Sequence, residues 1–406
     1  MDYKTHTLSN GIRLIHKFSD SAIAHCGIVV NTGSRDESEN EHGLAHLIEH
    51  TIFKGTAKRK SFQIIGRIED VGGEINAYTS KEETFIFSSF LSEYFGRTVE
   101  LLSDIMFNSI FPEKEIKKEI EVIIDEINSY KDSPSELIFD EFEEMIFKNH
   151  SIGRQILGEP NILKKFGKPE IRNFINKNYN TDEIVFCSIG NISFEKVKKY
   201  FEKYFSEVPQ NLRKKSRIAF QNYSPEIRSE NKDTYQTHSI IGNIAYSMKD
   251  KNRIPMVLLN NILGGQNLNS RLNIALREKT GYSYNVESSY VPNTDTGVFY
   301  VYFSSDLSNL QKCNDLVLKE FSKLRTKKLG VLQLSKAKRQ LMGQIAISYE
   351  NNSNLLLSIG KNFLHFNKIE GLKEINRKIE NITAINLLEI SNEILDHKKL
   401  SYLNYK

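Results

Sequence analysis

Two stretches of this sequence resemble one another, one in each half of the chain. Residues 43–55 read GLAHLIEHTIFKG and residues 254–265 read IPMVLLNNILGG, and each apolar helical pattern ends on a glycine. A further helical stretch, a glycine and two strand-like segments follow each of them. This repeat predicts two similarly folded halves, the alternative being a loose alignment of unrelated helices. The alignment places Asn260 opposite His50, so only the first copy carries a polar cluster.

Strand-like and helical patterns alternate along both halves, which predicts a fold that mixes α and β structure. The expected strands are residues 5–8, 12–17, 24–31, 74–79, 84–90, 183–189, 238–247, 284–290, 297–304 and 400–404. The expected helices are residues 41–53, 62–71, 92–108, 112–130, 135–148, 194–205, 254–263 and 270–278, with further long helices up to residue 396.

The 406 residues exceed what one ordinary core accommodates, so we expect two domains. A polar, aperiodic stretch that contains Pro209 separates the two halves and predicts a linker. The predicted boundaries are an N-terminal domain at residues 1–208, a linker at 209–223 and a C-terminal domain at 224–406.

Composition excludes several classes of protein. Lys and Arg number 55 and Asp and Glu number 51, so the net charge of +4 indicates no nucleic-acid or anionic-membrane partner. The sequence contains no run of 18 apolar residues, so no membrane span is expected. It also shows no apolar signal segment, which favours a cytoplasmic location unless a leader has been trimmed. The three cysteines, Cys26, Cys187 and Cys313, are widely spaced. They predict buried, reduced thiols and neither a disulfide nor a cysteine zinc site.

Residues 46–50 read HLIEH and carry the main chemical signal. His46 and His50 are four residues apart, so both imidazoles project from one face of a helix, with Glu49 beside them. Two such imidazoles are a natural zinc pair, and the carboxylate can take a proton from water whose pKa zinc lowers to about 7. HxxEH is the inverted form of the HExxH motif. The alternative is a solvated polar helix face.

A catalytic zinc needs a third protein ligand, and the expected helix 112–130 offers candidates. Glu119 and Glu126 lie seven residues apart on one stripe at the margin of its apolar face, where an unpartnered charge is costly. Glu126 as ligand and Glu119 as an accessory group would explain both, but two solvated glutamates are an equal alternative. His42 is expected to be a neighbour of the site, because a catalytic zinc keeps an open position.

The sequence resembles the pitrilysin/insulysin (M16) metallopeptidases over essentially its whole length, particularly the short subfamily related to mitochondrial processing peptidase. The matching stretches are residues 33–37 (GSRDE), 43–56 (GLAHLIEHTIFKGT), 72–84 (GGEINAYTSKEET), 119–128 (EIEVIIDEIN), 185–190 (VFCSIG) and 276–286 (LREKTGYSYNV). In this family about 75 residues separate the second histidine from the ligand glutamate. Here 75 residues separate His50 from Glu126.

The resemblance implies a complete set of residues for a metallopeptidase site. The implied zinc ligands are His46, His50 and Glu126. Glu49 is the implied general base, and Glu119 the implied accessory acidic residue.

The resemblance also implies a substrate-binding strand and an oxyanion-stabilising pair. A peptide adds to an exposed sheet edge that corresponds to Asn76, Ala77, Tyr78 and Thr79, where backbone pairing demands little of the sequence. From the sequence pattern alone, this segment is a plain strand after a diglycine turn. Arg277 and Tyr284 match the Arg and Tyr that stabilise the developing oxyanion. Tyr282 departs from the aliphatic residue usual at its position, and the spacing from Arg277 favours Tyr284.

The fold implied by the resemblance is α+β, with two homologous domains, each a mainly antiparallel sheet with helices packed on one side. Larger relatives carry four domains and enclose a chamber, so a two-domain chain predicts a dimer. A homodimer is favoured because the zinc motif and the Arg/Tyr motif occur in one chain. The alternative is a heterodimer with a metal-free M16 paralogue.

The implied activity is that of a zinc-dependent endopeptidase that binds one zinc ion per chain. Its expected substrates are peptides or small unfolded polypeptides, bound as an added β-strand in a closed chamber. Two alternatives stay open: a non-catalytic structural or presenting subunit of an M16-type complex, and a metal hydrolase that acts on a non-peptide substrate.

Overall fold

The structure, a computed structural model, describes residues 3–214, 216–232, 234–265 and 267–406. Residues 1–2, 215, 233 and 266, which fall within the predicted domains and linker, lie outside the described residues. The chain divides into two units, each assembled from separate segments. Unit 1 comprises Met1–Asn128, Arg154–Arg217 and Ser348–Glu370, and unit 2 comprises Ser129–Gly153, Ile218–Ile347 and Gly371–Lys406. The boundaries at residues 208 and 223 stay a prediction.

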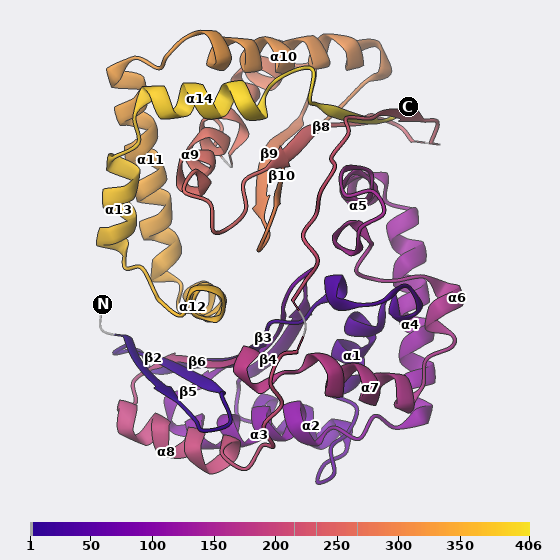
Figure 1. Ribbon diagram of the computed structural model, residues 1–406, viewed down its shortest axis with the longest axis vertical. Helices are drawn as coiled ribbons and strands as arrows, with labels where there is room; N and C mark the ends of the chain where they lie inside the picture. The colour runs from indigo at the N-terminus through magenta and orange to yellow at the C-terminus, as the bar shows by residue number, and fades with distance from the viewer. Residues whose placement is uncertain (1–2, 215, 233, 266) are drawn as a thin grey trace. The chain divides into compact units, whose positions relative to one another are not determined.

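Unit 1 contains a six-stranded sheet in the order β1-β2-β6-β3-β5-β4 (Figure 1). Its strands are β1 (Tyr3–Thr7), β2 (Arg13–Phe18), β3 (Ile23–Val30), β4 (Glu74–Thr79), β5 (Thr84–Leu91) and β6 (Ile184–Gly190). Neighbouring strands are antiparallel except for β2 and β6, which run parallel. β6 is buried at every position, as expected of a strand that is covered on both faces.

Helices from different parts of the chain cover the two faces of this sheet. Phe186 of β6 packs its ring against Phe201 and Phe205 of α8, whereas its neighbours Val185 and Cys187 pack against α12. Because side chains alternate along a strand, α8 and α12 cover opposite faces. The helices that begin in unit 1 are α1 (Leu44–Ile52), α2 (Ser61–Glu69), α3 (Phe95–Asn108), α4 (Glu113–Lys131), α6 (Pro160–Leu163), α7 (Lys168–Asn178), α8 (Phe194–Phe205) and α12 (Asn352–Phe366).

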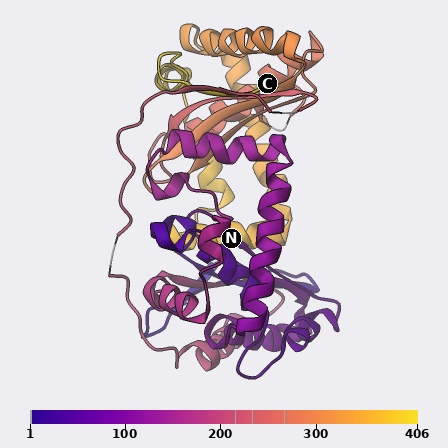
Figure 2. The same cartoon turned by 90° about the vertical axis from the view of Figure 1, so that its right-hand side faces the viewer.

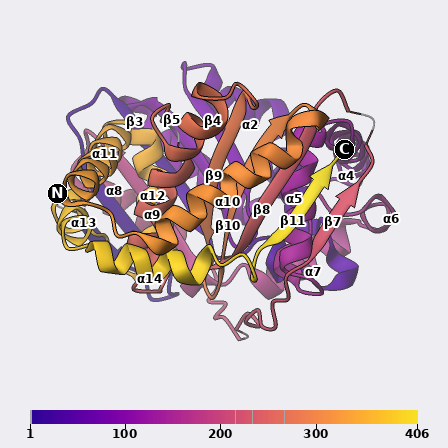
Figure 3. The same cartoon turned by 90° about the horizontal axis from the view of Figure 1, so that it is seen from above.

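Unit 2 contains a five-stranded sheet in the order β7-β11-β8-β10-β9 (Figure 3). Its strands are β7 (Ile227–Glu230), β8 (Thr237–Ala245), β9 (Asn285–Pro292), β10 (Gly297–Ser305) and β11 (Ser401–Tyr405). One face packs on the core formed with α9, α10 and α14, and the other on α5. The helices that begin in unit 2 are α5 (Pro134–Ile146), α9 (Arg253–Gly264), α10 (Leu310–Thr326), α11 (Val331–Glu350), α13 (Leu372–Glu380) and α14 (Ala384–Ile394).

The two sheets share one strand order and confirm the prediction of two similar halves. β2-β6-β3-β5-β4 corresponds to β7-β11-β8-β10-β9, and in both sheets only the first pair of this series is parallel. In chain order, α1 follows β3 as α9 follows β8. The helix with the HLIEH motif and the helix that lacks it therefore occupy equivalent places in the two halves. Among the described strands, β1 alone has no counterpart.

Each half of the chain also gives one helix to the other unit. α5 comes from the first half of the sequence but packs against β8 and β11 of unit 2. α12 comes from the second half but packs against β3 and β6 of unit 1. In each unit, helices of the unit's own half pack on one face of the sheet, and the exchanged helix takes the opposite face.

Most predicted elements occur within a few residues of their expected positions. The predicted linker is part of a long segment that, in its described residues, has neither helix nor strand between residues 206 and 226 (Figure 2). The expected helix 270–278 is instead a π-helix at Asn273–Glu278, and α7 and β7 had not been predicted.

Two further sequence-based expectations are met. The cysteines are buried and free, as predicted. Within the described ranges, no helix combines the length and the apolar character that crossing a membrane requires.

Candidate metal centre

The helix α1 carries the HLIEH motif, and its apolar side holds it in place. Leu44, Leu47, Ile48 and Ile52 are buried in the core of unit 1. With four apolar positions on one stripe of a nine-residue helix, the polar motif residues project from the rest of its surface. α1 also packs beside the edge strand β4.

The helix α4 supplies the predicted glutamates in the same way. The buried apolar residues of this helix are Ile116, Ile120, Ile123 and Ile127. Glu119 and Glu126 lie on the stripe next to them. Glu126 is partly exposed, whereas Glu119 is 9 % exposed. Their different burial predicts different tasks, because the buried carboxylate needs fixed partners.

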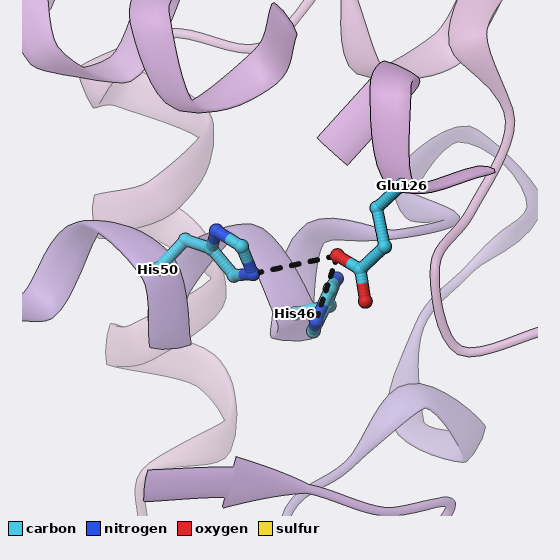
Figure 4. Close-up of side chains that lie close together, drawn as sticks. All are labelled: His46, His50 and Glu126. Atoms are coloured by element: carbon cyan, nitrogen blue, oxygen red, sulfur yellow. Dashed lines mark ion pairs between the residues drawn. The ribbon is translucent and has the colours of Figure 1, made fainter. Parts of the chain in front are cut away.

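His46, His50 and Glu126 come together, each offering one ligand atom within 4.8 Å of the others (Figure 4). Oε2 of Glu126 lies 3.7 Å from Nε2 of His50 and 4.0 Å from Nε2 of His46. These separations are too long for hydrogen bonds. Two ligands of one tetrahedral zinc ion lie about 3.4 Å apart. The cluster therefore has the donor types and approximate dimensions of a divalent-metal site with an open fourth position.

His46 is suited to act as a neutral ligand. Burial, with the nearby His50 adding a smaller effect, lowers the pKa of His46 to about 3, so its imidazole is neutral at physiological pH. The two rings lie edge to face with centroids 4.5 Å apart. Metal ligation uses neutral imidazole, so His46 is already in the required form.

Glu119 contacts His50 from the side opposite Glu126. Its Oε2 lies 3.3 Å from Nδ1 of His50, and its Oε1 lies 2.8 Å from Nζ of Lys54. A carboxylate at one imidazole nitrogen fixes the tautomer and leaves the other nitrogen free to ligate. Sequence reasoning missed Lys54, because only the packing of α4 beside α1 pairs it with Glu119.

Glu49 lies half-buried on α1 between the two histidines in sequence. Burial raises the pKa of Glu49, and the proximity of Glu126 adds to this effect, while Thr79 and His50 oppose it. A carboxylate with a raised pKa accepts and releases a proton more readily near neutral pH than an ordinary one. Its position and its pKa both suit a general base.

His42 is outside the three-residue cluster. Its Nε2 lies 2.7 Å from the backbone oxygen of Gln155, and its Nδ1 lies 3.6 Å from a carboxylate oxygen of Glu159. The imidazole of His42 therefore bonds to Gln155 and faces Glu159 instead of joining the cluster, as expected for a neighbour of the site.

The four residues expected to bind substrate lie on β4, which ends the sheet. In the described chain, β4 pairs with β5 along one side, and no strand pairs with its other side. Tyr78 packs its ring against Phe85 and Phe87, with centroids 5.8 and 6.4 Å away. The core therefore anchors the strand through Tyr78, while Asn76 is exposed.

Arg277 and Tyr284 lie in unit 2, at the end of the π-helix and just before β9. Tyr284 is 77 % exposed, and the side chain of Arg277 is 43 % exposed. Tyr282 instead packs against the core of unit 2, with Nζ of Lys312 5.1 Å from the centre of its ring. Of the two tyrosines, Tyr284 is the one available to a substrate.

Two family models match this chain and together span most of it. The model described as "Insulinase (Peptidase family M16)" matches residues 14–160, which include all three residues of the cluster. The model described as "Peptidase M16 inactive domain" matches residues 165–341.

Similar proteins are named as zinc proteases or processing peptidases. An uncharacterized zinc protease of Rickettsia felis is 32 % identical over 97 % of this chain and 95 % of its own length. The uncharacterized zinc protease YmxG of Bacillus subtilis is 29 % identical over 96 % of this chain and 94 % of its own length. The mitochondrial-processing peptidase subunit beta of Saccharomyces cerevisiae is 28 % identical over 98 % and 90 %.

Solved structures share the fold over the whole chain. The crystal structure of a protease from Helicobacter pylori has a TM-score of 0.91 at 20 % identity, covering 100 % of this chain and 99 % of its own. A structure titled as the peptidase M16 inactive domain from Pseudomonas fluorescens has a TM-score of 0.93 at 17 % identity, covering 100 % and 98 %.

Proposed function

Because this chain belongs to peptidase family M16, the insulinase family, we propose that it is a zinc-dependent endopeptidase. One observation carries the proposal: α1 and α4 bring His46, His50 and Glu126 within ligand distance of one ion, with Glu49 beside them. We propose these three side chains as the ligands of one zinc ion per chain. Relatives named zinc proteases support the choice of metal.

The proposed reaction is hydrolysis of a peptide bond by water. Bound zinc would lower the pKa of a water ligand to about 7 and polarise the substrate carbonyl. Glu49 takes the proton from the attacking water as its oxygen bonds to the carbonyl carbon, and returns it to the leaving amine as the C–N bond breaks. Glu119 holds Nδ1 of His50, so that Nε2 faces Glu126.

The proposed substrate is a peptide or a small unfolded polypeptide. Along the edge of β4 that no described strand pairs with, alternate residues of the segment Asn76, Ala77, Tyr78 and Thr79 turn their backbone groups outward, and α1 packs beside this strand. An extended peptide that pairs with this edge would be bound mainly through its backbone, which suits broad specificity.

Two residues of unit 2 are assigned a part in the proposed reaction. Arg277 and Tyr284 are assigned to stabilise the negative charge that develops on the carbonyl oxygen of the substrate. Their exposure supports this assignment. We also propose that the chain acts as a homodimer around a chamber, with a heterodimer as the alternative. The mass of one chain is 46.8 kDa, so the native mass distinguishes a monomer from either dimer.

The experiment measures zinc content and cleavage of unstructured peptides in variants of this protein. Glu49→Gln removes the proton acceptor but no ligand, so we expect retained zinc and loss of hydrolysis. Tyr284→Phe should keep zinc and lower kcat by about 10- to 1000-fold, because a donor to the oxyanion is lost. Glu121→Gln on the exposed side of α4 and Tyr235→Phe at a fully exposed position are matched controls and should behave like the wild type.

Each contrary result identifies what is wrong. Normal turnover by Glu49→Gln would refute its role as the base. Zinc binding without any peptide cleavage by the wild type would favour a non-catalytic subunit or a hydrolase of other substrates. A wild-type protein that binds no zinc would refute the proposed metal centre.

A further inference from the structure

The first turn of α1 lacks the usual cap. Gly43 occupies the N-cap position in the left-handed region, with φ of 94°, and has no side chain that could accept a hydrogen bond. Helices leave their first backbone N–H groups without partners, and a side chain at the N-cap usually satisfies one of them. α1 contains two of the three cluster residues, so its start needs another partner.

Packing against a second glycine prevents Gly43 from carrying a capping side chain. A Cβ atom at Gly43 would lie 2.8 Å from the Cα atom of Gly158, closer than side-chain carbons approach in proteins. Serine or aspartate at this position would therefore combine an unfavourable φ with a steric clash. The cap has to come from elsewhere in the chain.

Glu37 supplies this cap from the preceding loop. Its Oε2 accepts a hydrogen bond from the backbone N–H of Gly43 at 3.0 Å, and its Oε1 accepts one from Ala45 at 2.7 Å. The residue is 4 % exposed, so water does not compete for these donors. A carboxyl group at a helix N-terminus also interacts favourably with the helix dipole.

The loop that carries Glu37 is itself fixed on both sides. Arg35 forms a buried ion pair with Glu82, with Nη1 and Oε1 2.7 Å apart. Asp36 accepts hydrogen bonds from Nε and Nη2 of Arg217 at 2.9 and 2.7 Å. With its neighbours held in this way, Glu37 is a rigid support for α1.

We propose that Glu37 is a positioning residue for the metal centre, because it fixes the first turn of α1 and thereby the ligand nitrogen of His46. This inference rests on the proposed zinc site. His46 is the third residue of α1 and follows Ala45 directly, so a frayed or rotated first turn would displace it. His50 lies one turn further and would move less.

The test compares Glu37→Gln with Glu41→Gln, a matched control in the same loop. The hydrogen bonds described for Glu41 are with Ser38 and Lys177, neither of which belongs to α1. Burial raises the pKa of Glu37 to about 8 although the two amide hydrogen bonds oppose the rise, so measurements are made at about pH 8.5. Zinc affinity is measured by competition with a chelator, and ligand geometry by the visible spectrum of the Co²⁺-loaded protein.

We expect Glu37→Gln to bind zinc about tenfold more weakly, with an altered Co²⁺ spectrum, while Glu41→Gln matches the wild type. If Glu37→Gln binds zinc as tightly as Glu41→Gln and only melts at a lower temperature, Glu37 is a structural cap and the proposal is wrong. If Glu37→Gln does not fold, Glu37→Asp decides, since its shorter side chain reaches one amide at most. Unchanged zinc affinity in that variant also refutes the proposal.

Failure of the zinc site itself gives a different result. A wild-type protein that binds no zinc would refute the proposed function and this inference together. Wild-type binding that Glu37→Gln does not change would refute this inference alone.

Discussion

The imidazole of His50 lies between two carboxylates that have different environments. Glu126 is partly exposed and faces Nε2, whereas Glu119 is buried, faces Nδ1 and is also held by Lys54. We propose that the buried carboxylate fixes the orientation of the ring and that the exposed one approaches an ion. This difference in burial assigns different roles to two glutamates that look alike in sequence.

Glu119→Gln tests the orienting role. The amide leaves Lys54 without a counter-charge and gives Nδ1 of His50 a weaker partner, so we expect zinc affinity to fall by about 10- to 100-fold. Chelator competition measures the change. Glu115→Gln, at a partly exposed position of the same helix, is the control. Equal affinities for the two variants would contradict the role.

The residues of the site differ in how far the sequence predicts them. His46, Glu49 and His50 follow from spacing alone, because the helical period is local information. Glu126 could be chosen among the many glutamates of its helix only through the family resemblance. Lys54 and Glu37 fall within the matching stretches 43–56 and 33–37, but the sequence assigned a role to neither. The partner of Lys54 lies on a different helix, and the missing capping residue before α1 was the signal for the role of Glu37.

At the scale of elements, α12 is attached to the sheet of unit 1 by a polar cluster as well as by apolar contacts. Nε2 of His365 lies 2.7 Å and Nζ of Lys361 3.0 Å from Oε1 of Glu83, in the turn before β5. Arg13 of β2 donates hydrogen bonds to the backbone oxygens of Phe363 and Leu364 near the end of the helix. These contacts fix α12 along its axis, which apolar packing alone specifies less strictly.

The cluster predicts a pH dependence of stability. Burial would raise the pKa of Glu83, but His365 and Lys361 outweigh it and hold this pKa below its ordinary value of 4.5. The stabilisation of the folded state by ionised Glu83 is therefore present above pH 4.5 and is lost as the pH falls through the lower pKa of the folded state. Glu83→Gln should lower the free energy of unfolding by about 1–3 kcal/mol at pH 7. The variant should also lose less of this free energy than the wild type when the pH is lowered.

Urea denaturation at pH 7, 5 and 4 measures both effects. Glu93→Gln, at an exposed position of unit 1, is the control and should keep the acid dependence of the wild type. A Glu83→Gln protein with the stability and acid profile of the wild type would show that the cluster contributes nothing.

Elements that the sequence did not predict have weak local signals. α7 buries Ile171 and Phe174 among polar residues, so its apolar period is short. β7 has the sequence IRSE and is a strand only because it pairs with β11, far away in the chain. The π-helix at Asn273–Glu278 has the same apolar spacing, on this short scale, as the α-helix predicted there.

At the scale of the whole molecule, the exchange of α5 and α12 was beyond the reach of sequence patterns. The apolar faces of both helices are visible in the sequence, but a face does not specify which of two similar sheets it covers. The choice depends on the length and direction of the connecting segments, which periodicity does not report.

The exchange predicts that mutations act on the unit distant in sequence. Ile359 of α12 is 1 % exposed in the core shared with β3 and β6, so Ile359→Ala should speed hydrogen exchange at Ile23–Val30 and Ile184–Gly190. Phe142→Ala in α5 should do the same for β8 and β11 of unit 2. Each truncation is expected to destabilise its unit by about 2–5 kcal/mol.

Mass spectrometry of exchanged peptides measures both variants side by side, and each serves as the control for the other. Faster exchange in the sheet of the same sequence half, with the other sheet unchanged, would contradict the assignment of these helices.

The exchanged helix α12 also sets the order in which the protein can be completed during synthesis. Proteins emerge from the ribosome N-terminus first, and early domains commonly fold before later ones are made. Here all strands of the unit 1 sheet are translated before Ser348–Glu370, yet one face of that sheet waits for this segment. Until Ser348–Glu370 has been translated, the apolar side chains of β3 and β6 on that face remain open to water, to chaperones and to other nascent chains.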